Sequence, residues 1–110
     1  MFDKDNPKIT FDEGVLTAKI FGDIDHHCAK HVREAIDSAI FSYKPNTVLL
    51  DLSAVEFMDS SGLGLILGRY NTAIEMNSEF KLINPSSGVK RVLELAGIER
   101  IIKIEGDVRV

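Results

Sequence analysis

The chain has 110 residues, of which 45% are hydrophobic and 27% charged, and its formal net charge is −4 at pH 7. This size and composition predict one globular domain spanning residues 1–110, and the acidic balance argues against nonspecific binding of nucleic acid or of an anionic membrane surface. A single cysteine excludes an internal disulfide, no apolar run reaches the roughly 18 residues of a membrane span, and the first residues do not resemble a signal peptide, so we expect a cytoplasmic protein.

The first part of the chain predicts a β-hairpin followed by a helix. A short apolar run at 9–11, a turn and a β-branched segment at 15–21 are typical of two paired strands. Gly22 interrupts the second strand, and Asp25 is a suitable N-cap because its carboxylate can accept hydrogen bonds from first-turn amides. The helix ends at 44–46, a Lys-Pro-Asn sequence. Its predicted inner face has apolar residues three and four positions apart: Ala29, Val32, Ile36, Ala39, Ile40 and Tyr43.

The rest of the chain alternates strands and helices. We expect a strand at 47–52, a turn at 53–57, a helix from Ser60, a strand at 79–83, a helix capped by Ser86 or Ser87 and ended by Gly97, and a short edge strand at 101–104. The order β-β-α-β-α-β-α-β indicates an α/β fold, a mixed β-sheet packed with helices. Loops at the carboxyl ends of parallel strands usually form the sites of such sheets, which directs attention to 22–25 and 57–62.

The segment 58–64, Met-Asp-Ser-Ser-Gly-Leu-Gly, begins a helix with an unusual amount of glycine. Gly62, Gly64 and Gly68 together cost about 3 kcal/mol of helix stability relative to alanine. A helical projection places an apolar stripe toward the core, made of Leu63, Ile66, Leu67, Tyr70, Ala73 and Ile74. It places the following residues outward: Ser61, Gly64, Leu65, Gly68, Arg69 and Thr72. Close packing accounts for Gly62, whereas Gly64 and Gly68 favour a smooth outer surface on which another protein docks.

Ser60 has two interpretations that the pattern leaves open. Serine is a preferred N-cap, although Asp59 can serve equally well. The functional alternative is phosphorylation, since free amides and the helix dipole stabilise a phosphate at a helix N-terminus. The added charge of about −1.5 to −2 beside Asp59 would then repel a docked partner. A third hypothesis is a small-molecule or nucleotide-binding module that holds an anion at the same helix N-terminus.

Enzymatic and metal chemistry fit the sequence less well. The glycines lack the Gly-Lys-Ser/Thr of a Walker loop and the acidic partner of a Rossmann unit, and Met58 occupies the first glycine position of a hydrolase elbow. His27 and His31 share a helix face without a third metal ligand at clear spacing, and Cys28 is better explained by packing. We therefore expect no catalytic residue, no metal and no cofactor.

Residues 57–70, Phe-Met-Asp-Ser-Ser-Gly-Leu-Gly-Leu-Ile-Leu-Gly-Arg-Tyr, closely resemble the signature of anti-sigma factor antagonists of the STAS domain family, and most of all its sporulation members. The loop 22–27, Gly-Asp-Ile-Asp-His-His, matches the family's second hallmark, and 84–97 resembles its C-terminal helix region. The resemblance covers essentially the whole chain and implies a single STAS-type domain.

The resemblance also implies a function. In this family the unphosphorylated antagonist binds an anti-sigma factor that is itself a serine kinase, which frees a sigma factor for transcription. The kinase uses ATP to phosphorylate the first serine of the motif, here Ser60, and a PP2C-type phosphatase reverses the reaction, so the domain is a substrate and not an enzyme. Asp25 occupies the position of a loop aspartate that supports binding and phosphorylation. The expected partner-binding residues are Asp25, Asp59, Ser61, Gly62, Leu63 and Arg69.

Overall fold

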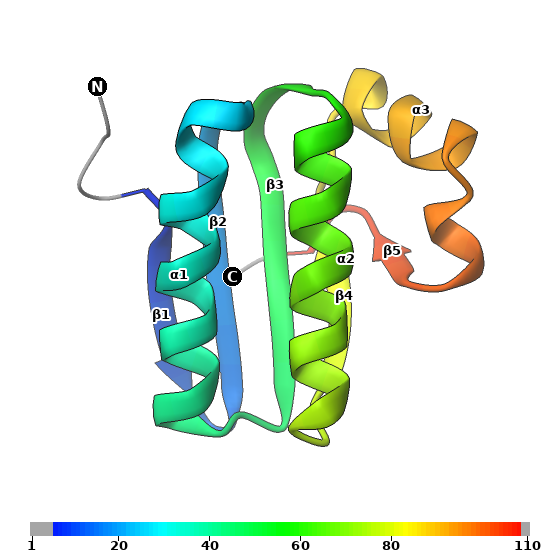
Figure 1. Cartoon of the computed structure of the whole chain (residues 1–110). Coiled ribbons are helices and arrows are strands. Elements are labelled where there is room, and N and C mark those ends of the chain that lie inside the picture. Colours follow the sequence, from blue (N-terminus) through cyan, green and yellow to red (C-terminus); the bar gives the residue numbers. More distant parts are fainter. Residues whose placement is uncertain (1–5, 109–110) are drawn as a thin grey trace.

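The computed structural model describes residues 6–108. Its elements follow the chain in the order shown in Figure 1: β1 Lys8–Asp12, β2 Val15–Ile24, α1 His26–Tyr43, β3 Thr47–Met58, α2 Ser60–Glu75, β4 Glu79–Ile83, α3 Ser87–Leu95, the 3₁₀ helix η1 Ile98–Arg100 and β5 Lys103–Glu105. The expected order of strands and helices is confirmed, with η1 added before the last strand.

The strands form one mixed sheet in the order β1-β2-β3-β4-β5. β1 and β2 are the predicted antiparallel hairpin, and the remaining neighbours are parallel. Each parallel pair needs a crossover, and α1, α2 and α3 supply the three crossovers. The α/β fold class predicted from the alternation is therefore confirmed.

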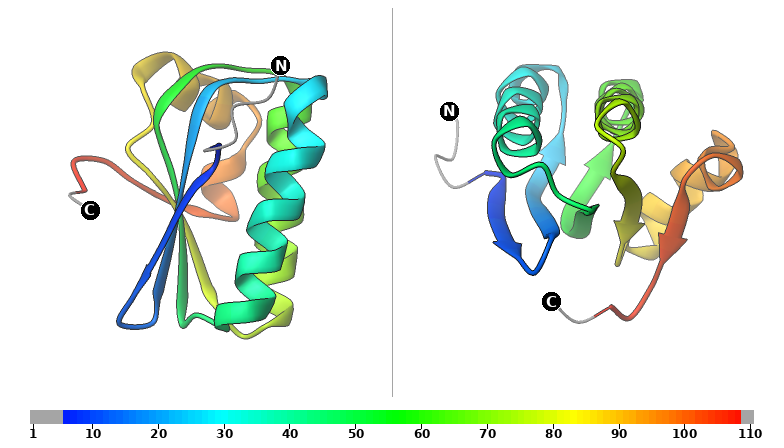
Figure 2. Two further views of the ribbon diagram at one scale, coloured as in Figure 1. Left: turned by 90° about the vertical axis from the view of Figure 1, so that its left-hand side faces the viewer. Right: turned by 90° about the horizontal axis from the view of Figure 1, so that it is seen from below.

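α1 and α2 lie side by side across one face of the sheet, whereas α3 and η1 lie toward the β4–β5 side of the molecule (Figures 1 and 2). The core between sheet and helices consists mainly of aliphatic side chains, and the largest of the fully buried ones include Leu16, Ile20, Ile36, Leu50, Ile66 and Leu82. Two residues assigned to inner helix faces are instead half exposed, namely Tyr43 and Ile74. Tyr43, the last residue of α1, stacks on Phe11 of β1 at 4.6 Å between ring centroids.

Two expected loops are in fact strand. β2 continues through Gly22 to Ile24, and β3 continues through 53–57, which we had expected to be a turn. The continuation is stabilised by burial, since Val55 and Met58 are only 2% and 3% exposed. Gly22 has a φ of 74° at a shift in the β2–β3 register, a conformation that glycine adopts without strain.

Side-chain amides support the strand ends. Asn6 donates to the carbonyl of Phe21 at 3.0 Å and accepts from its N–H at 3.1 Å, beside the register shift in β2. Asn84 makes the same reciprocal pair with Val108, at 2.6 Å and 2.8 Å. Each pair satisfies both the N–H and the C=O of one backbone residue.

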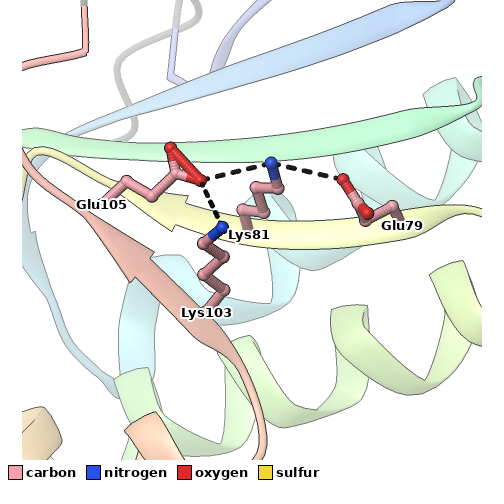
Figure 3. A network of polar contacts seen from close by, with 4 residues as sticks. All are labelled: Glu79, Lys81, Lys103 and Glu105. Atoms are coloured by element: carbon pink, nitrogen blue, oxygen red, sulfur yellow. Dashed lines mark ion pairs between the residues drawn. The ribbon is translucent and has the colours of Figure 1, made fainter.

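Charged residues cover the β4–β5 edge (Figure 3). Lys81 Nζ lies 3.3 Å from Glu79 Oε1 and 3.2 Å from Glu105 Oε1. Glu105 Oε1 also forms an ion pair with Lys103 Nζ at 3.6 Å. Hydrogen bonds to Glu105 and Glu79 raise the pKa of Lys81, and the bond from Lys81 lowers the pKa of Glu105. Such exposed pairs contribute little stability, but charged side chains discourage edge-to-edge pairing of the short strand β5.

Candidate functional site: two capped helix N-termini and the groove between them

The site begins where β2 and β3 end together. Ile24 and Met58, their last residues, pair across the sheet, and each is followed by an aspartate and a helix. Neighbouring strands lie roughly 4.8 Å apart, so the N-termini of α1 and α2 emerge next to each other. Sequence reasoning identified both loops, and the strand extension explains why they meet at one place.

Each helix is capped by its aspartate. Asp25 accepts the N–H groups of His27 at 2.9 Å and Cys28 at 3.2 Å, and the bond from Cys28 is the main cause of the lowered pKa of Asp25. Asp59 accepts the N–H of Ser61 at 2.8 Å. The predicted N-cap at Asp25 is confirmed, and the choice between Asp59 and Ser60 is settled in favour of Asp59.

Ser60 is therefore the first helical residue of α2, and its side chain is exposed. Its hydroxyl is not needed for capping, which removes the purely structural explanation of that serine. Ser61, the second hydroxyl, is half-buried. An anion attached to Ser60 would lie in the positive field of the first-turn amides, close to the carboxylate of Asp59.

The projection of α2 was wrong for two outward residues. Leu65 and Arg69 are 4% and 6% exposed, because α1 covers that side of the helix in addition to the sheet beneath it. Gly64 is exposed as expected, Gly68 is half-buried, and a Cβ at either would meet nothing within 4 Å. The part of the α2 surface without side chains is therefore narrower than predicted, and it consists of Gly64 and Gly68 beside α1.

Two of the expected partner-binding residues contribute to packing. Gly62 is buried, and a Cβ there would collide with the side chain of Met58 and lie 3.3 Å from Ile24 Cγ2, so glycine permits the close approach of α2 to the strand ends. Leu63 is half-buried against the core. Gly62 therefore has a packing role, and its contribution to partner binding stays a prediction.

Arg69 joins the two helices. Its Nε lies 2.7 Å from Oδ1 of Asp37, a residue of α1. Burial lowers the pKa of Arg69 and the nearby Arg33 lowers it further, whereas Asp37 opposes both effects. A groove runs between the helices, lined on α1 by Lys30 and Arg33 and on α2 by Ser61, Gly64, Gly68 and Arg69. Sequence reasoning missed this groove, because its basic residues come from a helix that was treated separately.

The arrangement offers no obvious reaction chemistry. Within residues 6–108, no three His, Cys, Asp or Glu side chains are grouped so that they could hold a metal ion. None of the helices in this described part of the chain is long and apolar enough to cross a membrane. What the site presents is an exposed hydroxyl on a helix N-terminus, next to a groove between two helices.

The mixed sheet, with Ser60 just beyond the carboxyl end of its central strand β3, has the fold of a known domain family. A family model described as STAS domain matches residues 6–110. An anti-sigma F factor antagonist from Paenibacillus polymyxa is 37% identical over 91 residues, which cover 83% of this chain and 78% of that protein. The chain belongs to the STAS domain family.

Solved structures agree with this assignment. The anti-sigma factor antagonist SpoIIAA in its unphosphorylated form superposes with a TM-score of 0.76 at 29% identity, covering 89% of this chain and 86% of that one. The Bacillus SpoIIAA in its phosphorylated form gives a TM-score of 0.69 at 28% identity, covering 89% of each chain. The resemblance inferred from the two hallmark segments is therefore confirmed.

Proposed function

We propose that this protein is an anti-sigma factor antagonist whose unphosphorylated form binds a serine-kinase anti-sigma factor and so releases a sigma factor. Phosphorylation of Ser60 by that kinase, with ATP, turns binding off, and a PP2C-type phosphatase restores it. The protein is the substrate of these enzymes and not an enzyme. We further propose that it acts in the cytoplasm and regulates sporulation transcription.

The observation that carries the proposal is the position of Ser60. It is exposed, it is the first residue of α2, and Asp59 has taken over the capping role. A kinase can reach this hydroxyl without unfolding the helix. The relatives support the regulatory part, since two of them are named anti-sigma F factor antagonists. The structurally similar SpoIIAA has both an unphosphorylated and a phosphorylated form.

The physical basis of the switch is local charge. A phosphoserine brings about −1.5 to −2 at pH 7 onto a surface that already carries the carboxylates of Asp25 and Asp59. The first-turn amides of α2 stabilise this charge, so the fold persists while the docking surface changes. We propose that the following residues contribute to that surface: Asp25, Asp59, Ser61, Gly62, Leu63 and Arg69.

The test is incubation with the cognate anti-sigma factor kinase and ATP, followed by intact-mass measurement. We expect one phosphoryl group on the wild type and on Ser61→Ala, and none on Ser60→Ala. Phosphorylation of Ser60→Ala but not of Ser61→Ala would move the switch to the second serine. No phosphorylation of any variant, together with no binding of the kinase, would refute the proposed function.

A further inference from the structure

The groove between α1 and α2 concentrates positive charge on a protein whose net charge is −4. Its lining includes three cationic side chains: Lys30, Arg33 and Arg69. No Asp or Glu is among the described residues that line it. The nearby Asp37 is paired with Nε of Arg69 and does not line the groove. Local charge of this sign favours an anionic occupant.

Arg69 has hydrogen-bonding capacity that the described residues do not use. Its side chain is only 7% exposed and its Nε faces Asp37. Its Nη1 is buried and has no hydrogen-bond partner within residues 6–108. Buried guanidinium N–H groups are normally satisfied, and a guanidinium binds carboxylates with matched geometry. The ion pair with Asp37 fixes the side chain, while Nη1 is left for a group that enters the groove.

The two glycines leave the groove beside Arg69 uncovered. Neither Gly64 nor Gly68 carries a side chain over the groove, and the space above each is empty to at least 4 Å from an added Cβ. Since glycine in a helix interior costs about 1 kcal/mol, two such residues on one strip need a compensating reason. Close approach of another chain is such a reason, and internal packing is not.

From these observations we propose that the groove receives a carboxylate side chain of the protein that docks on α2, held by Arg69 and Arg33. This proposal rests on the proposed function, in which an anti-sigma factor docks beside Ser60. The occupant is a side chain of that partner because the groove is continuous with the serine site: Ser61 lines it, one residue after the phosphoacceptor.

The experiment measures the dissociation constant for the anti-sigma factor by calorimetry at two salt concentrations. Arg33→Glu and Lys30→Glu are the main variants, because both side chains are exposed and neither is in the core. We expect each to weaken binding at least tenfold and to reduce the salt dependence. Arg100→Glu, an exposed charge reversal on η1, is the matched control and should bind like the wild type.

Arg69→Lys adds a second measurement, since it keeps the charge but removes the free Nη1. We expect weaker binding, with circular dichroism confirming the native fold. Replacement of the contacted Asp or Glu of the partner by Arg should restore binding to Arg33→Glu.

If Arg33→Glu and Lys30→Glu bind like the wild type while Ser60 is still phosphorylated, the groove proposal is wrong and the proposed function stands. If the wild type neither binds nor is phosphorylated, both fail.

Discussion

Replacing Gly64 and Gly68 by alanine should make this protein more stable and less able to bind its partner. Glycine in a helix interior is about 0.8–1 kcal/mol less favourable than alanine. An added Cβ at either position meets no atom within 4 Å, so no steric cost offsets that gain. The double variant should therefore gain about 2 kcal/mol.

The assay is urea unfolding followed by circular dichroism, with the melting temperature as a second measure. For a chain of 110 residues, unfolding entropy of about 2.1 cal/mol/K per residue converts each kcal/mol to roughly 4 °C, so the double variant should melt about 8 °C higher. The control is Gly62→Ala, whose Cβ would collide with Met58 and which should lose about 1–3 kcal/mol. Destabilisation by Gly64→Ala or Gly68→Ala would refute the argument that this strip is open.

Three further outcomes are expected. Ser60→Asp should fold normally and bind the anti-sigma factor at least tenfold more weakly in calorimetry, whereas wild-type affinity would show that charge is not the switch. Asp59→Ala should lose about 1 kcal/mol of unfolding free energy and Ser60→Ala less than about 0.5, since only Asp59 caps α2; equal losses would contradict this assignment. The carboxyl group of Asp25 should titrate with a pKa below the ordinary value of 3.8, because the Cys28 amide stabilises its charged form. NMR of the carboxyl carbon measures this titration. A carboxylate whose pKa is lowered on folding stabilises the folded state at pH values above its unfolded-state pKa, and this contribution is lost as the pH falls through the folded-state pKa. The cap of α1 should therefore weaken in acid, and a titration midpoint at or above 3.8 would contradict the cap.

The sequence predicted the order of elements and both aspartate-led loops, because alternating apolar patterns and Asp–helix starts are local signals. It failed at 53–57, where polar residues suggested a turn but Val55 and Met58 are buried in a continuing strand. The prediction that Leu65 and Arg69 face outward was also wrong. A helical projection assumes one buried direction, and α2 has two, toward the sheet and toward α1.

Other parts of the site were beyond sequence reasoning for a similar reason. Asp37 and Arg33 belong to α1, and only the packing of α1 against α2 brings them close to Arg69. The assignment of the cap to Asp59 needed coordinates, since neighbouring Asp and Ser are equally suitable caps. Ser60 as the phosphoacceptor still rests on the family resemblance together with its exposed position.

The central claim is that one phosphoryl group on Ser60 controls binding of an anti-sigma factor. The most direct measurement is a titration of the phosphorylated and the unphosphorylated protein against the same anti-sigma factor under identical conditions. We expect tight binding of the unphosphorylated form, and a loss of at least a hundredfold in affinity for the phosphorylated form with an unchanged circular dichroism spectrum. Equal affinities of the two forms would contradict the claim.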